Sequence, residues 1–88
     1  LDEIAKLLAA EPELRVHVVG HTDSIGGLDA NMALSKRRAD AVQAALVSQY
    51  GVAQSRLSAN GVAYLAPVAV NTNDEGRAKN RRVELVPF

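Results

Sequence analysis

The fold class follows from residues 14–51, which read LRVHVVGHTDSIGGLDANMALSKRRADAVQAALVSQYG. The segment 14–19 is rich in valine and alternates in part between apolar and polar residues, which is typical of a β-strand. A polar, glycine-containing loop follows over 20–27. From 28 to 50 the apolar residues recur at helical spacing, and Gly51 stands where a left-handed helix cap is expected. The sequence therefore predicts a strand, a loop and a long helix in succession.

Shorter elements are expected on both sides of this unit. Glu11-Pro12 ends the first helix, because proline removes a backbone donor and restricts the residue before it. Thr72 and Glu75 have capping-box spacing, with a hydroxyl at the cap and a carboxylate three residues later. The further elements are a helix over 1–10, a weaker strand over 57–63, a short helix from this cap to 79 and a strand over 82–86. A strand, a long helix and another strand suggest a right-handed crossover, so the predicted fold is α/β, a small mixed sheet covered by helices.

Size and composition exclude several classes of protein. A chain of 88 residues has room for one domain or a part of one. It has no cysteine, which excludes disulfide frameworks, thiolate metal sites and a cysteine nucleophile. Ten basic and ten acidic residues give zero net charge, and only 3% of the residues are aromatic, so a phosphate-attracting field and base-stacking platforms are not expected. No apolar run approaches the roughly 20 residues that span a bilayer, so the sequence predicts a soluble domain.

The long helix carries polar residues on the face that its apolar residues mark as buried. With residues placed about 100° apart and Val42 at the centre of the buried stripe, Arg38 points inward. An unpaired buried charge costs several kcal/mol, so Arg38 requires an anion or a position at the rim. The other inward residues are Asn31, Ser35, Ala39, Ala45 and Leu46, whereas Lys36, Arg37 and Asp40 face solvent.

A carboxylate is expected near this arginine. The strand ending at Val19 delivers Asp23 to the edge where ligands gather in open α/β sheets, and the long helix starts from the same edge. Side chains from the two segments are therefore expected to converge on one shallow pocket, namely those of Asp23, Asn31, Ser35 and Arg38. A guanidinium binds a carboxylate in bidentate fashion and an aspartate binds an ammonium, so this pocket suits a small zwitterion. The residues alone leave open that Asp23 and Arg38 form a structural ion pair instead.

The same residues carry a resemblance to a known family. The matching segments are Gly20-His21-Thr22-Asp23-Ser24-Ile25-Gly26, Asn31, Leu34-Ser35-Lys36-Arg37-Arg38-Ala39, Gly61, Pro67, Asn71 and Glu75-Gly76-Arg77-Ala78-Lys79-Asn80-Arg81-Arg82-Val83-Glu84. They occur in order over nearly the whole chain and resemble the OmpA-like peptidoglycan-binding domain. The resemblance implies a periplasmic module of Gram-negative envelopes that is not an enzyme and has no cofactor and no metal. It also implies non-covalent binding of the diaminopimelate stem peptide of peptidoglycan, which anchors a membrane-attached parent protein to the cell wall.

Five residues match positions of that family's ligand site. By position, Asp23 matches the aspartate that receives the ligand ammonium, and Arg38 matches the arginine that clamps its carboxylate. Thr22, Asn31 and Arg81 match positions that line or support the pocket. The resemblance therefore implies that these five residues form the ligand site.

Two departures from the family are visible in the sequence. The family usually begins with a strand and a loop before its first helix, and these are absent here, so residues 1–88 are expected to be one OmpA-like domain truncated at its N-terminus. A missing strand could expose a sheet edge that another chain fills, and a dimer is therefore an open prediction. Ile25 stands where many members carry a small polar residue, which affects one side-chain contact.

Other functions have weaker support from the same residues. A hydrolase built on His21, Asp23 and a serine lacks a specified base and orienting group. His17 and His21 would lie about 13 Å apart along a strand, too far to share a metal ion, so both are interpreted as ordinary surface or loop histidines. The basic residues between 77 and 82 are interrupted by acidic ones and have no aromatic partners, so no nucleic-acid partner is expected. The remaining alternative is a structural or protein-interaction module that keeps the fold without the ligand.

Overall fold

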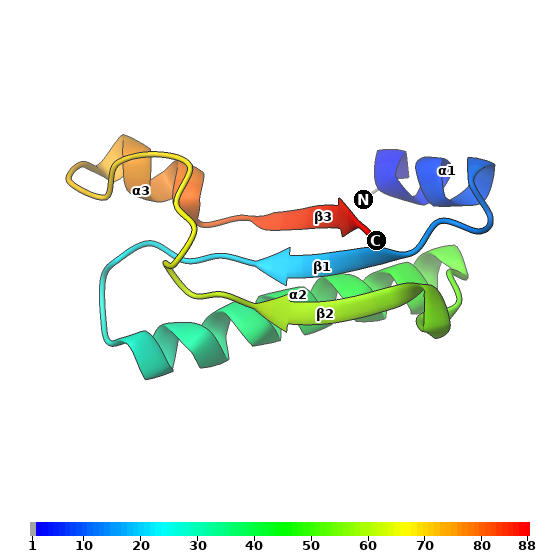
Figure 1. The fold of residues 1–88 in the computed structure, drawn as a ribbon, viewed down its shortest axis with the longest axis horizontal. Coiled ribbons are helices and arrows are strands. Elements are labelled where there is room, and N and C mark those ends of the chain that lie inside the picture. Colours follow the sequence, from blue (N-terminus) through cyan, green and yellow to red (C-terminus); the bar gives the residue numbers. More distant parts are fainter. Residues whose placement is uncertain (1) are drawn as a thin grey trace.

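The computed structural model describes residues 2–88 and confirms the predicted α/β class. The elements follow in the order α1 (Asp2–Ala10), β1 (Val16–Gly20), α2 (Leu28–Tyr50), η1 (Gln54–Arg56), β2 (Leu57–Gly61), α3 (Asp74–Asn80) and β3 (Val83–Pro87) (Figure 1). Every expected helix and strand is present within a few residues of its predicted bounds, and the short 3-10 helix η1 was not predicted. Leu1, expected to open the first helix, lies outside the described residues.

The three strands form one mixed sheet in the order β2-β1-β3. β1 runs parallel to β2, with Gly20 opposite Gly61, and antiparallel to β3, with Gly20 opposite Val83. Parallel neighbours require a crossover, and α2 carries the chain from the end of β1 back to the start of β2. α2 packs along one face of the sheet, and its N-terminus lies at the end where β1 and β2 finish (Figure 1).

One apolar core lies between α2 and the sheet. Its buried residues are Leu8, Val16, Val18, Ala39, Leu46, Val52 and Leu57. β1 alternates buried and half-buried residues, as expected for a central strand whose two faces differ in cover. Complete burial of a leucine or valine side chain contributes roughly 1.5–3 kcal/mol, so this cluster supplies the main favourable term of folding. Between residues 2 and 88 no helix combines the length and the apolar character that crossing a bilayer requires.

Two glycines let α2 approach the sheet closely. A Cβ atom added to Gly20 would lie 2.0 Å from the carbonyl oxygen of Ser35, and one added to Gly61 would lie 2.4 Å from Ser35 Oγ. The Ser35 hydroxyl accepts a hydrogen bond from the backbone N–H of Ala63 at 3.1 Å and donates to the carbonyl of Met32 at 3.0 Å. Ser35 was expected to line the ligand pocket, but it is fully buried and joins α2 to the segment after β2.

The segment 62–73 is held in place by the buried side chain of Asn80. Its Oδ1 accepts from the backbone N–H groups of Val68 at 2.8 Å and Ala69 at 3.0 Å. Its Nδ2 donates to the carbonyl of Ala69 at 2.9 Å and to Oδ1 of Asn71 at 2.8 Å. One amide thus fixes this loop against the last turn of α3.

The predicted N-terminal cap of α3 is wrong by one residue. Asn73, not Thr72, is the N-cap, and its side-chain oxygen accepts from the backbone N–H of Gly76 at 2.7 Å. Asn and Thr both cap helices well, so residue type alone does not separate two adjacent candidates. The predicted left-handed cap of α2 is confirmed, because Gly51 has a φ of 68°.

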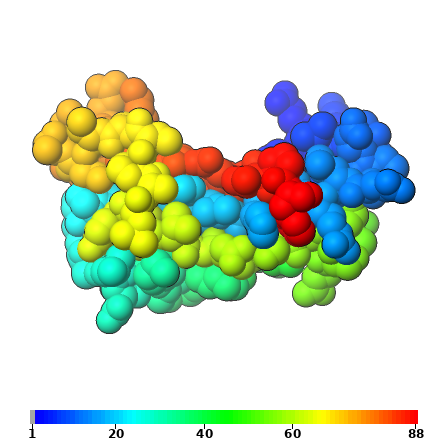
Figure 2. Space-filling view, viewed as in Figure 1, coloured from blue at the N-terminus to red at the C-terminus, as the bar shows by residue number. Residues whose placement is uncertain are grey.

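The outer edge of β3 lies between two helices. α1 and α3 are at opposite ends of the sheet on the β3 side (Figure 1), and the surface dips between them over β3 (Figure 2). Within residues 2–88, β3 pairs with β1 alone, so its second edge carries no strand.

Candidate ligand-binding site

Five segments of the chain meet at one end of the sheet. β1 and β2 finish there, β3 begins there, and α2 and α3 have one terminus there (Figure 1). The predicted site residues lie on these segments or on the loops that join them, and they are Thr22, Asp23, Asn31, Arg38 and Arg81. The fold therefore brings all five to one end of the domain.

Asp23 is the buried carboxylate of this end, with 7% of its surface exposed. Its Oδ1 accepts from the backbone N–H of Ile25 at 3.0 Å, and its Oδ2 accepts from Nη1 of Arg81 at 2.8 Å. Burial raises the pKa of the Asp23 carboxyl, but these hydrogen bonds and the positive charges of Arg81 and Arg77 outweigh burial and hold the pKa below its ordinary value. Asp23 is therefore a carboxylate at neutral pH.

Arg38 is half-buried at the rim of the α2 face. The buried residues of α2 are Asn31, Ser35, Ala39 and Leu46. They centre the buried stripe on the side of Ala39, whereas the sequence placed its centre at Val42. Nη1 of Arg38 donates to the backbone carbonyl of His21 at 3.4 Å, which is the one hydrogen bond of this guanidinium to the described residues. The rim position leaves its other donors available to a ligand.

The structure does not contain the ion pair between Asp23 and Arg38 that the residues alone left open. The salt bridge of Asp23 is to Arg81, whose side chain is 45% exposed. Arg38 instead binds the carbonyl of His21, two residues before Asp23. The carboxylate of Asp23 and the guanidinium of Arg38 therefore lie against one short loop without a salt bridge between them.

Thr22 and Asn31 are buried and support this loop. The Thr22 hydroxyl donates to the carbonyl of Asp23 at 3.0 Å, and its backbone N–H donates to the carbonyl of Ala63 at 2.8 Å. Nδ2 of Asn31 donates to the carbonyl of Ile25 at 2.9 Å. Both side chains are thus used to hold the backbone around Asp23.

His21 also lies at this end of the molecule, where the sequence predicts only an ordinary surface or loop histidine. It lies in a loop, as expected, yet only 5% of its surface is exposed. Its Nε2 lies 3.3 Å from Oε1 of Glu84, and its Nδ1 is buried without a hydrogen-bond partner in residues 2–88. Burial and the charge of Arg82 lower the pKa of His21, and Glu84 opposes them. The burial of His21 and its contact with Glu84 depend on the pairing of β1 with β3, which the sequence pattern around His21 does not indicate.

Comparison with known proteins identifies the family. The sequence profile of the OmpA family matches residues 1–81. This chain belongs to the OmpA family. Outer membrane porin F from Pseudomonas fluorescens is 51% identical over 81 residues, which are 92% of this chain and 24% of that relative. Peptidoglycan-binding protein ArfA from Mycobacterium bovis is 43% identical over 86 residues, 98% of this chain and 26% of that relative.

A solved structure agrees with the OmpA-family assignment. The peptidoglycan-associated lipoprotein from Burkholderia pseudomallei superposes with a TM-score of 0.89 at 34% identity, covering 98% of this chain and 72% of that one. The chain spans about a quarter of the length of the two curated relatives. The family confirms two further predictions, that the domain is not an enzyme and that it belongs to the periplasmic side of a Gram-negative envelope.

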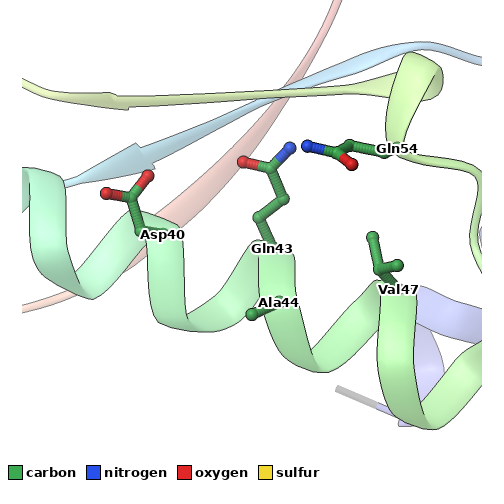
Figure 3. Close-up of a pocket in the computed structure, with 5 residues that line it drawn as sticks. All are labelled: Asp40, Gln43, Ala44, Val47 and Gln54. Carbon is green, nitrogen blue, oxygen red and sulfur yellow. The ribbon is translucent and has the colours of Figure 1, made fainter.

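A surface hollow of about 330 Å³ lies elsewhere on this OmpA-family domain. It is lined by Asp40, Gln43, Ala44, Val47 and Gln54. Figure 3 shows the amides of Gln43 and Gln54 facing each other across it. The hollow contains none of the five predicted site residues.

The described part of the OmpA-family chain holds no group of three or more His, Asp or Glu side chains placed to bind a metal ion. The two histidines have separate surroundings. The His17 ring stacks on Phe88 with centroids 4.1 Å apart, whereas His21 faces Glu84. Neither histidine shares a site with the other.

Proposed function

We propose that this OmpA-family domain binds the diaminopimelate-containing stem peptide of peptidoglycan non-covalently and anchors its parent protein to the cell wall. The observation that carries the proposal is that Asp23 and Arg38 lie against the same loop with opposite charges and without a salt bridge to each other. The ligand class is supported by relatives described as peptidoglycan-binding and peptidoglycan-associated.

The two charged groups have separate roles. Diaminopimelate carries a carboxylate and an ammonium at the free end of its side chain. The remaining donors of Arg38 bind the carboxylate, since a guanidinium presents parallel N–H groups. Asp23 accepts from the ammonium, because each carboxylate oxygen has a second acceptor position beyond those used by Ile25 and Arg81.

The three other predicted residues support this contact. Thr22 and Asn31 hold the backbone on either side of Asp23. Arg81 fixes Oδ2 of Asp23, and its partial exposure leaves further donors for the ligand. Thr22, Asn31 and Arg81 thus support a site whose main ligand-binding groups are Asp23 and Arg38.

A single stem peptide is expected to bind modestly. Charge-assisted hydrogen bonds contribute roughly 1.5–3 kcal/mol each, and the pocket offers only a few of them. Firm attachment then comes from tethering, because the wall presents many stem peptides and a membrane-held parent raises the effective concentration.

Co-sedimentation with purified insoluble peptidoglycan tests this function. The wild-type domain is expected to pellet, and the double variant Asp23→Asn/Arg38→Ala is expected to remain in the supernatant. Arg37→Ala is the matched control, because Arg37 is exposed and should leave pelleting unchanged. Equal pelleting of the wild type and the double variant would overturn the site. A wild type that does not pellet would favour the alternative of a structural or protein-interaction module.

We also propose that the outer edge of β3 pairs with a second copy of this chain in solution. A strand edge presents unpaired N–H and C=O groups, which favour pairing with another strand. Two β3 strands related by a two-fold axis run antiparallel, so the contact is self-complementary and closed. The dip between α1 and α3 leaves this edge accessible (Figure 2).

A further inference from the structure

His21 connects the two charged halves of the proposed site. Its carbonyl accepts from Nη1 of Arg38 at 3.4 Å, and Asp23 follows two residues later. Its backbone N–H donates to the carbonyl of Arg82 at 2.8 Å, which ties the loop to the start of β3. A movement of the His21 backbone would therefore shift the Asp23 loop and remove the carbonyl that Arg38 binds.

The His21 side chain has a partner for one ring nitrogen only. The Glu84 carboxylate accepts hydrogen bonds, so the hydrogen of the neutral ring is assigned to Nε2, 3.3 Å from Oε1. Nδ1 is then a bare acceptor, buried and without a partner in the described chain. Protonation would create a buried N–H at Nδ1 that has no acceptor, which is unfavourable.

The charged groups facing the imidazole are Glu84 of β3, Arg82 just before β3, and Arg38 of α2. Glu84 favours the protonated ring, but Nε of Arg82 also binds Oε1 of Glu84, at 2.7 Å. Arg82 itself repels a second positive charge, and Arg38 of α2 lies on the carbonyl side of His21. Burial is the largest influence and lowers the pKa of His21. The folded domain therefore favours neutral His21.

We propose that His21 is a positioning residue whose neutral ring holds the Asp23 loop in its ligand-binding arrangement, so that protonation of His21 weakens binding of the stem peptide. The proposal rests on the proposed function. Proton and ligand then compete, and affinity falls as the pH drops through the pKa of His21 in the free domain, which burial holds below the ordinary histidine value of about 6.5. Asp23 stays ionised in this range because hydrogen bonds and nearby positive charges hold its pKa below the ordinary value.

Binding of a diaminopimelate-containing tripeptide at pH 7.5 and pH 5.5 tests the proposal. The wild type is expected to bind more weakly at pH 5.5, and the loss should grow as the pH is lowered further through the pKa of His21. His21→Gln can still donate to Glu84 but takes up no proton, and it should bind equally at both pH values. His17→Gln, which alters the other histidine, should keep the wild-type difference. An unchanged wild-type Kd, or the same weakening in His21→Gln, would overturn the proposal.

A titration without ligand separates this proposal from the proposed function. The amide signals of Thr22, Asp23 and Ile25, followed by NMR, are expected to shift together with the His21 ring. Glu84→Gln should move this transition to lower pH, because Glu84 favours the protonated ring. Loop amides that do not follow His21 would contradict the positioning role. If they follow His21 while the tripeptide fails to bind at pH 7.5, the ligand is wrong and the positioning role is supported.

Discussion

Asp23 is expected to contribute to both stability and ligand binding. It is buried, bound by a backbone N–H and by Arg81, and still has acceptor positions for a ligand. Because its pKa is lower in the folded state than in the unfolded chain, its ionised form stabilises the fold above the unfolded value of about 3.9. That stabilisation is lost as the pH falls through the folded-state pKa.

We therefore expect Asp23→Asn to weaken the acid sensitivity of the fold. Between about pH 5 and pH 2 the free energy of unfolding of the wild type should fall more steeply than that of the variant, because only the wild type takes up this proton on unfolding. Urea unfolding at a series of pH values measures both slopes. Equal slopes would show that Asp23 has the same pKa in the folded and unfolded states.

At the level of helices and strands, the packing of α2 against the strand ends determines where the candidate site lies. A side chain at position 20 would collide with the backbone of Ser35. The close approach of α2 to the sheet therefore requires that residue 20 has no Cβ atom. Gly27, the N-cap of the same helix, has nothing within 4 Å of an added Cβ atom and a φ of −77°. Gly20 and Gly27 can therefore serve as a test position and its control, because an added side chain is blocked at the first and free at the second.

Gly20→Ser should destabilise the domain by at least about 1–3 kcal/mol, because a backbone group must move to admit the side chain. Gly27→Ser should be neutral or stabilising, since serine is a preferred N-cap residue and the space is open. Urea denaturation of both variants gives the comparison. A Gly20→Ser variant as stable as the wild type would show that the close approach is not required.

The cap of α3 provides a second prediction about an element. Asn73→Ala removes the side-chain acceptor for the N–H of Gly76 and should cost about 1 kcal/mol. Thr72→Ala should change stability by less than about 0.5 kcal/mol, because Thr72 is exposed and is not the cap. Thermal unfolding distinguishes the two, and a larger loss for Thr72→Ala would restore the capping box predicted from the sequence.

Local signals in the sequence were sufficient for the elements but not for the partners of the site residues. Helix α2 was predicted over its observed range, because a glycine-containing loop precedes it and Gly51 ends it. The bond from Arg81 to Asp23 joins residues 58 positions apart and depends on where α3 ends, which no local pattern encodes. The burial of His21 likewise depends on the register of β3, and the rim position of Arg38 on a small rotation of α2.

At the scale of the whole molecule, zero net charge fits a zwitterionic ligand. The chain has no overall field to attract an anion, so recognition depends on where single charges lie. The fold places Asp23, Arg38 and Arg81 at one end of the sheet and leaves the β3 edge open between α1 and α3 (Figures 1 and 2).

The open β3 edge predicts that the 88-residue chain self-associates. Sedimentation velocity over a range of concentrations should show a shift from monomer to dimer, because strand pairing at this edge is isologous. A single monomer species at the highest concentration would contradict the dimer. It would leave the ligand site untouched, since the site residues are not on this edge.

The most direct test of the ligand assignment compares two stem tripeptides that differ only in carrying diaminopimelate or lysine. The diaminopimelate form should bind and shift the NMR signals of Thr22, Asp23, Ile25 and Arg38. The lysine form lacks the carboxylate for Arg38 and should bind at least about tenfold more weakly, as should the diaminopimelate form to Arg38→Ala. Equal affinity for the two tripeptides, or shifts centred on the hollow lined by Asp40 and Gln54, would contradict the account.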